Sequence, residues 1–285
     1  MMELPPVRPP ALLDLSFVRR GGETRIDRRR FRWPFVLTGS FVLDGDPPYL
    51  RSVILQSSSG AMTGDDRLSQ RIVVAEGAAA HVSTQAATVV HRADPGPGSS
   101  ERIDLQVAGG GYLEFLPDPR ILFPGAALTQ RLDLTLAPGG AAIISDSFAL
   151  HRPSGAEAAP VRYRSDITLR RPVGRPLVLD RQRLPDPPPA ETCHAGLYIL
   201  WPGADAQAAE VSASLSRALA AVPGLYGAAS PLPHGMGVGL RLVSRDARAL
   251  RRGMDLSWSA GRARILGRAP GPGRTGEKRH PAEPG

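Results

Sequence analysis

Hydrophobic and polar residues alternate in short runs along the first two thirds of the chain, and glycine- or proline-containing turns separate the runs. The runs at 12–20 and 23–31 flank Gly21 and Gly22 and predict a β-hairpin. A second hairpin is predicted to bend at Gly174. The rhythm is strand, turn and strand without a fixed period, so it predicts a mainly β body over 12–185 with largely antiparallel strands.

The pattern changes after the proline-rich connector 184–196. Alanine and leucine dominate 205–222, where the apolar residues fall on one helical face, so this segment is predicted to be a helix. A second helix is predicted over 244–259. Two strands complete this part of the chain, at 197–202 and 237–244. We therefore expect 186–267 to form a small C-terminal α/β part with two helices.

The two ends of the chain are poor in apolar residues. Residues 1–11 are rich in proline, and 268–285 consist largely of glycine, proline and charged residues. Such segments bury too little apolar surface to offset the entropy lost on ordering, so both are predicted to be disordered. The chain has 285 residues, of which 42% are hydrophobic, and this is enough to build a sizeable core between the two ends.

The formal net charge is +8, and Lys278 is the only lysine, so arginine supplies almost all of the positive charge. The arginines are spread along the chain, and no RNP, zinc-finger or basic-zipper pattern accompanies them. This favours a solvated, arginine-rich surface over nucleic-acid binding and leaves an acidic protein partner open. Cys193 is the only cysteine, which excludes an intrachain disulfide. With no signal peptide and no apolar run of membrane-spanning length, we expect a soluble, cytoplasmic protein without membrane contact.

The stretch LQSSSGAMTGDDRL at 55–68 invites a chemical interpretation. It matches neither a phosphate-binding loop nor the nucleophile elbow of a serine hydrolase. Asp65 and Asp66 either cap a turn through nearby backbone N–H groups or face a water-filled passage, where they would attract cations. Spacing alone favours the turn.

The histidines and the single cysteine give no pattern of a tight metal site. No two histidines have HxH or HxxxH spacing, and adjacent Cys193 and His194 are predicted to be an ordinary loop pair. His81 lies in a predicted strand beside alanines, where a hydrogen-bonded structural role is favoured over a ligand role. The six histidines are His81, His91, His151, His194, His234 and His280.

Several phrases of the sequence occur together in a characteristic order. These are LDLSFVRRGGETRI, GAMTGDDRL, VSTQAATVVHRA, LEFLPDPRILFPGAAL and PLVLDRQRL. In order and spacing they resemble the urease accessory protein UreD family, whose members are also called UreH. The resemblance runs from about residue 13 to 185 and continues more faintly through the predicted helices; LPDPRILFPGA and STQAAT carry it most specifically.

The resemblance implies a fold and a function. Family members have an elongated, β-helix-like, mainly β fold, and they act without catalysis. They form a complex with the helical accessory protein UreF and the GTPase UreG. That complex docks on apo-urease and helps to deliver nickel to its active site, for which an internal water-filled tunnel is proposed.

Matching by position gives candidate site residues. Asp65, next to Asp66, matches the family's GD turn, Ser83 and Thr84 match its hydroxyl pair, and Asp146 falls where the family often has an acid. These five are predicted to line the tunnel or to contact nickel transiently. Imidazole and thiolate bind nickel strongly, whereas oxygen ligands and water hold it loosely. We therefore expect nickel in transit, with no tightly bound cofactor.

The candidate partner-binding residues are all arginines. Arg92 matches a basic residue that follows the T-x-A-T run, and Arg248, Arg251 and Arg252 lie on or near the last predicted helix. Contact with UreF or urease is one interpretation, and a solvated helix face is the other. A β-rich adaptor for another acidic protein, without a metal role, is the alternative function. A hydrolase is disfavoured because no spaced triad is present.

Overall fold

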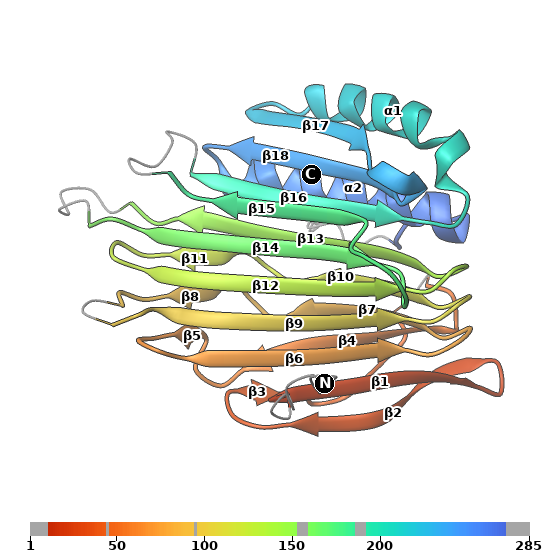
Figure 1. Ribbon diagram of the computed structural model, residues 1–285, viewed down its shortest axis with the longest axis horizontal. Coiled ribbons are helices and arrows are strands. Elements are labelled where there is room, and N and C mark those ends of the chain that lie inside the picture. The colour runs from red at the N-terminus through yellow and green to blue at the C-terminus, as the bar shows by residue number, and fades with distance from the viewer. Residues whose placement is uncertain (1–10, 44–45, 94–95, 153–158, 186–191, 272–285) are drawn as a thin grey trace, which may run out of the picture.

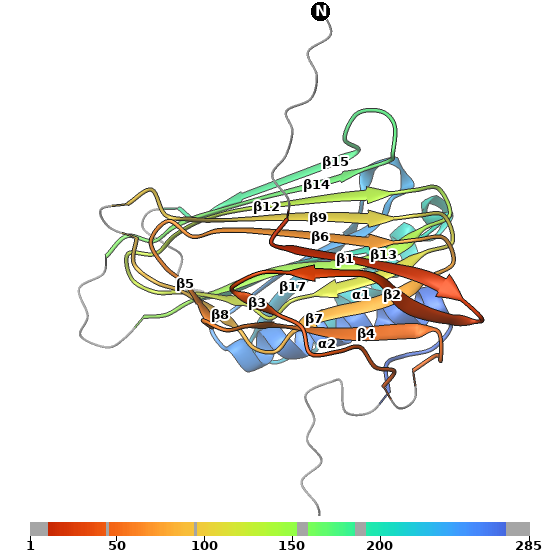
Figure 2. The ribbon, with the colours of Figure 1, turned by 90° about the horizontal axis from the view of Figure 1, so that it is seen from below.

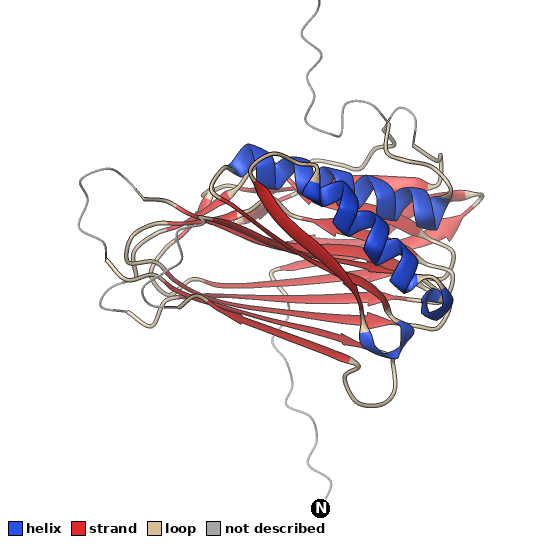
Figure 3. Cartoon of the chain, turned by 90° about the horizontal axis from the view of Figure 1, so that it is seen from above, coloured by secondary structure: helices blue, strands red, loops and turns tan. Residues whose placement is uncertain are grey.

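Two β-sheets packed face to face make up most of the molecule, and two α-helices cover the outer side of one of them (Figures 1 and 3). The computed structural model describes residues 11–43, 46–93, 96–152, 159–185 and 192–271. The predicted terminal segments 1–11 and 268–285 therefore lie mostly outside the described residues. No helix in the described part of the chain combines the length and the apolar character needed to cross a membrane.

The strands divide between a seven-stranded and an eleven-stranded sheet. The first contains β1 (Leu13–Arg20), β2 (Glu23–Phe31), β6 (Arg67–Val74), β9 (Ser99–Val107), β12 (Ala127–Leu136), β14 (Arg162–Arg170) and β15 (Val178–Arg183), in the order β15–β14–β12–β9–β6–β1–β2. The second contains β3 (Phe35–Val36), β4 (Leu50–Ser57), β5 (Ala61–Met62), β7 (Ala79–Thr84), β8 (Thr88–Val90), β10 (Tyr112–Leu116), β11 (Arg120–Leu122), β13 (Ala141–Leu150), β16 (Cys193–Leu200), β17 (Leu225–Pro231) and β18 (Gly237–Ser244). Its main path runs β17–β18–β16–β13–β10–β7–β4–β3.

The mainly β, β-helix-like class is confirmed, but the prediction of largely antiparallel strands is wrong. β1, β6, β9, β12 and β14 pair in parallel, as do β4, β7, β10 and β13. Between β4 and β14 the chain passes back and forth between the two sheets, so the parallel strands pair with strands that lie a full coil away in sequence (Figures 1 and 2). Antiparallel pairs occur at the ends, including the two predicted hairpins β1–β2 and β14–β15 and the C-terminal strands β16 to β18.

The glycine-containing turns between β6 and β7, β9 and β10, and β12 and β13 are corners that carry the chain from one sheet to the other. These corners stack, because the amides of Ala75, Ala108 and Ala137 donate to carbonyls of the preceding coil at 2.9 Å in each case. Gly110 and Gly139 occupy the same corner position with φ of 66° and 79°. Residues with a β-carbon disfavour that conformation, so glycine suits this stack.

Three strands of the eleven-stranded sheet are interrupted before they resume. β4 and β5 are separated by 58–60, β7 and β8 by 85–87, and β10 and β11 by 117–119. The short strands β5, β8 and β11 pair with one another in parallel, and β11 also pairs with the far half of β13. The segments STQAAT and LPDPR span two of these breaks.

The space between the sheets holds apolar residues at both ends. One buried cluster includes Phe17, Ile72, Leu105 and Leu134 and lies toward the stacked corners. A second cluster, around Phe148, lies toward the other end. Apolar burial of this extent is the main force that holds the two sheets together.

The C-terminal part continues the eleven-stranded sheet, since β16 pairs with β13. The predicted helix 205–222 is observed as α1 (Ala208–Ala220), preceded by the 3-10 turn Ala204–Ala206; a second 3-10 turn spans Pro233–Gly235. The predicted helix 244–259 is observed as α2 (Ala247–Leu266), which is capped by the Asp246 carboxylate and ends at Gly267. Its glycines allow close packing on the sheet: a Cβ at Gly253 would lie 2.4 Å from Leu225.

Candidate functional site

A single row of buried polar residues separates the two apolar clusters between the sheets, and we call this row the polar belt. Five of its residues lie on the neighbouring strands β6, β9, β12 and β14 of the seven-stranded sheet. The other two lie on β11 and β13 of the eleven-stranded sheet. All are at most 5% exposed. The polar belt consists of Gln70, Glu101, Arg120, Gln130, Asp146, Tyr163 and Ser165.

Glu101 and Arg120 form an ion pair at one end of the polar belt. Arg120 donates from Nη2 and Nε to Glu101 Oε2 at 2.6 and 3.1 Å, and Gln70 donates to Oε1 at 2.7 Å. Burial by itself lowers the pKa of Arg120, but the charge and hydrogen bonds of Glu101 outweigh it and raise the pKa. The guanidinium therefore stays charged between the sheets.

Asp146 is the second carboxylate of the polar belt, and neutral groups hold it. Gln130 donates to Oδ1 at 2.8 Å, Ser165 donates to Oδ2 at 2.5 Å, and the Tyr163 hydroxyl lies 3.2 Å from both oxygens. Burial and the nearby Asp146 charge raise the pKa of Tyr163 well above its ordinary value, so its hydroxyl remains a donor. With two carboxylates and one guanidinium, the polar belt has a formal charge of −1.

A cavity of about 80 Å³ reaches the polar belt at the strand breaks. Its lining includes Gly60, Gln85 and Ala86 from the breaks and the inward-facing Glu101 and Arg120. Interrupting the strands removes backbone that would otherwise close the sheet here. The breaks therefore leave a cavity that reaches the ion pair.

A second cavity, of about 500 Å³, lies between α2 and the eleven-stranded sheet. Its walls are mostly apolar, with Leu250, Met254 and Trp258 from α2 and Ser83 from β7. Thr84 lines both cavities, so it marks the place where they approach each other through the sheet.

The predicted tunnel residues lie in different parts of the structure. Asp146 lies in the polar belt, Thr84 lines the cavity that reaches it, and Ser83 faces the cavity under α2. Asp65 and Asp66 line neither cavity. Asp65 is exposed, and Asp66 Oδ2 accepts from the backbone N–H of Thr63 at 2.7 Å, which is the turn-capping arrangement.

The four predicted partner-binding arginines are exposed. Arg92 forms an isolated antiparallel bridge with Ala126 and lies far from α2 in sequence. Arg248, Arg251 and Arg252 are in the first turns of α2. Arg251 forms hydrogen bonds within the chain, because it donates to Asp118 at 2.8 Å and to Asp255 at 3.2 Å.

No group of three or more His, Cys, Asp or Glu side chains that could hold a metal occurs within the described ranges. Cys193 and His194 begin β16 and do not form the expected loop pair; Cys193 is buried, and the His194 ring stacks on Phe148. The expectation of transit without a tight site stays a prediction.

A second buried charged cluster was missed from the sequence. Arg262, fully buried on α2, donates to Glu114 on β10 and from Nη1 to Asp46 at 2.8 Å. His81 Nδ1 and the Tyr112 hydroxyl each lie 2.5 Å from Glu114. Burial raises the pKa of Glu114, but the hydrogen bonds and charges of Arg262 and His81 outweigh it and lower the pKa below its ordinary 4.5.

One sequence signal could have revealed the polar belt. Gln70 has the same alternation phase as Ile72, and Glu101 the same phase as Ile103 and Leu105, so these polar residues share the buried face. A polar residue at an inward position demands a partner, because leaving it unpaired in the interior is costly. The identity of that partner depends on the other sheet.

These features define a class of protein: a β-solenoid-like scaffold with a row of buried polar residues between its two sheets. The family model for the UreD urease accessory protein matches residues 10–276. The chain belongs to the UreD urease accessory protein family, which supports a role in urease maturation together with other maturation proteins.

Relatives from several bacteria agree with this assignment. Urease accessory protein UreD 2 of Bradyrhizobium sp. strain BTAi1 is 47% identical over 250 residues, covering 86% of this chain and 87% of the relative. UreD 1 of Methylorubrum extorquens strain PA1 is 38% identical, covering 94% and 92%. UreD of Mycolicibacterium smegmatis is 34% identical, covering 84% and 85%.

Proposed function

We propose that this protein is a non-catalytic scaffold that links UreF and UreG to apo-urease and passes nickel through the polar belt toward the urease active site. The observation that carries the proposal is the cavity at the strand breaks, which reaches Glu101, together with the buried carboxylate of Asp146 further along the same row.

The chemistry of the polar belt suits passage of a divalent cation. Its net formal charge is negative, and its available ligands are carboxylate, amide and hydroxyl oxygens, which bind nickel less tightly than imidazole or thiolate. Asp146 is held by three neutral donors, so no fixed cation has to leave it when nickel approaches. Arg120 donates its hydrogen bonds to Glu101, so Asp146 is the carboxylate of the polar belt that accepts only from neutral groups.

The test is urease activation with purified components. Apo-urease, UreF, UreG and this protein are incubated with limiting nickel, and urease activity is followed with time. Replacing Asp146 by Asn keeps the side-chain volume and is expected to slow activation several-fold while the complex still assembles. Asp27→Asn, which changes an exposed acid on the edge strand β2, serves as the matched control.

The outcomes separate the alternatives. Full activation with Asp146→Asn would refute passage through the polar belt and favour the adaptor without a metal role. Equal activation when the whole protein is omitted would refute the maturation scaffold itself.

A further inference from the structure

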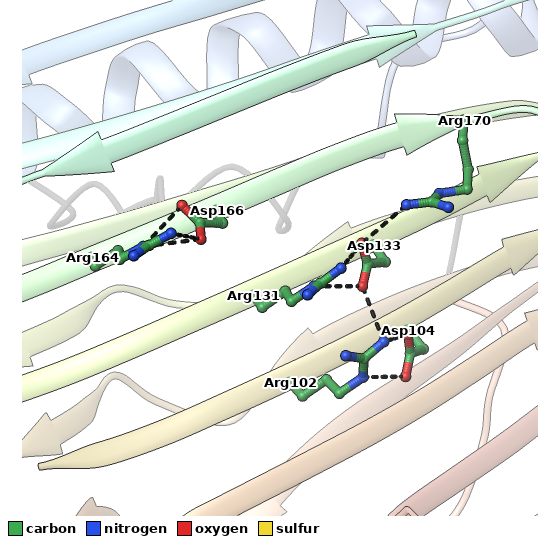
Figure 4. A network of polar contacts seen from close by, with 7 residues as sticks. All are labelled: Arg102, Asp104, Arg131, Asp133, Arg164, Asp166 and Arg170. Atoms are coloured by element: carbon green, nitrogen blue, oxygen red, sulfur yellow. Dashed lines mark hydrogen bonds and ion pairs between the residues drawn. The ribbon is translucent and has the colours of Figure 1, made fainter. Parts of the chain in front are cut away.

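The outer face of the seven-stranded sheet carries a ladder of arginine and aspartate side chains (Figure 4). Three neighbouring strands each have the motif Arg-x-Asp, at 102–104 on β9, 131–133 on β12 and 164–166 on β14. Within β9, Arg102 contacts Asp104 at 2.8 and 2.9 Å, and across the strands it contacts Asp133 at 3.1 Å. Arg102, Arg131 and Arg164 each have an aspartate partner in their own strand. These pairs reduce the repulsion between like charges on neighbouring strands, so the three arginines have a structural role in the sheet.

Two further arginines on this face are not accounted for by the ladder. Arg170, at the end of β14, approaches Asp133 only to 3.8 Å, and its buried Nε has no hydrogen-bond partner. The guanidinium of Arg181 on β15 has no hydrogen-bond or ion-pair partner among the described residues, and the residue is exposed.

These residues surround one hollow of about 340 Å³. The register places Arg131, Asp166 and Arg181 in one row across β12, β14 and β15. Thr168 and Leu179 pair in the next row. The lining contains four arginines and a single acid, namely Arg131, Arg164, Arg170, Arg181 and Asp166. Asp166 pairs with Arg164, and the neighbouring Asp133 pairs with Arg131, so the excess positive charge of the hollow lies at Arg170 and Arg181.

Apolar side chains are exposed beside this positive hollow. Leu179, in its lining, is 58% exposed, and Val173, in the turn between β14 and β15, is 88% exposed. Arginine on an edge strand protects against unwanted strand pairing, and that explains a charged β15. It does not explain an exposed leucine between the arginines. Arginine next to exposed apolar surface is typical of protein–protein interfaces.

We propose that the hollow over β12, β14 and β15 is the docking site for an acidic segment of a partner protein. A carboxylate of the partner pairs with Arg170 and Arg181, and an apolar residue next to it packs on Leu179. The inference rests on the proposed function, because the partner is sought among the proteins of urease maturation. The partner surface is defined by its chemistry: one or more Asp or Glu side chains flanked by an apolar side chain.

The experiment measures the affinity of the full-length protein for purified apo-urease, UreF and UreG separately, at low and at high salt. The test variant is Arg170→Ala/Arg181→Ala. The control is Arg25→Ala/Arg29→Ala on the opposite edge strand β2, which removes the same charge from exposed positions. One of the three partners is expected to bind the test variant about tenfold more weakly at low salt, with a shallower salt dependence, while the control binds normally.

A third variant, Leu179→Ser, distinguishes a protein segment from a free anion. A protein partner is expected to lose affinity for Leu179→Ser at both salt concentrations, because the lost contact is apolar. Titration with inorganic phosphate tests the other source of negative charge. Phosphate binding that depends on Arg170 and Arg181, with unchanged binding of all three partners, would overturn the proposal.

The remaining outcomes are also decisive. Equal affinity of wild type and the Arg170/Arg181 variant for every partner overturns the docking site but leaves the scaffold function standing. A wild-type protein that binds none of the three partners overturns both. Thermal melting of each variant within a few degrees of wild type confirms that lost binding is not lost folding.

Discussion

Arg262→Met gives the sharpest test of how α2 is held on the sheet. The substitution keeps the length of the side chain but removes the charge between Glu114 and Asp46, whose side chains are 0% and 1% exposed. Breaking a buried ion pair by removing one partner costs about 3–5 kcal/mol, because a buried charge is left uncompensated. His81 and Tyr112 still contact Glu114, so we expect the lower end, about 3 kcal/mol.

The assay is thermal and urea unfolding at pH 7. A loss of about 3 kcal/mol corresponds to a fall in the melting temperature of roughly 6–12 °C for a chain of this size. The matched control is Arg252→Met, an exposed position on the same helix, for which a change within about 0.5 kcal/mol is expected. The double variant Glu114→Gln/Arg262→Met should recover part of the lost stability, because only the Asp46 carboxylate is then left buried without its cation.

The pH dependence has a definite sign. In the wild type the pKa of Glu114 lies below its ordinary 4.5, so its stabilisation is present above that pH and is lost as the pH falls below it. In Arg262→Met the lowering by Arg262 is absent, so the pKa of Glu114 is higher than in the wild type and the variant loses less stability than the wild type as the pH falls. The stability difference between the two proteins should therefore be largest near pH 7 and narrow toward pH 4. A loss no larger than that of the control, or a difference that widens in acid, would refute this reasoning.

Two further predictions concern the turns. Asp66→Ala removes the acceptor for the Thr63 N–H and should cost about 0.5–1.5 kcal/mol in urea unfolding, while urease activation in the reconstituted assay stays normal; slowed activation would instead support a place for Asp66 on the nickel route. Gly139→Ala forces a β-carbon into a corner with φ of 79° and should cost about 1–2 kcal/mol, measured by the shift in thermal midpoint, whereas Gly39→Ala, where a Cβ meets open space at ordinary φ, should change it little.

Local patterns in the sequence predicted several elements correctly. The hairpins at Gly21–Gly22 and Gly174, the strand β18 and the existence of two C-terminal helices all follow from alternation, turn residues and helix-forming residues within a short window. The end of α2 was predicted seven residues too early, against an observed end at Leu266. Close packing of its glycines on the sheet, which stabilises the last turns, is a tertiary effect.

The direction of strand pairing was wrong for a physical reason. A sheet buried on one face shows the same alternation whether its strands run parallel or antiparallel, and a glycine turn can close a hairpin or form a corner between two sheets. In β9 the alternation is regular, yet its neighbours β6 and β12 belong to other coils of the chain. Only the stacking of coils decides which strands meet.

The sequence likewise indicated one part of the candidate site and missed the other. The resemblance selected STQAAT and LPDPR, which form two of the strand breaks, and it selected Asp146. It did not select Glu101 or Arg120. Each is a charged residue without a distinctive motif around it. Their pairing joins β9 of one sheet to β11 of the other, so it follows only from the tertiary structure.

The sequence by itself determined that this is a mainly β chain with a helical C-terminal part, because alternation, turns and helix propensity act over a few residues. It also indicated the family, through several short phrases that occur in a characteristic order. The tertiary structure decided the parallel coiling, the polar belt, the buried ion pair between Arg262 and Glu114, and the positive hollow at Arg170 and Arg181. Each of these depends on side chains that lie far apart along the chain and meet only when the coils stack.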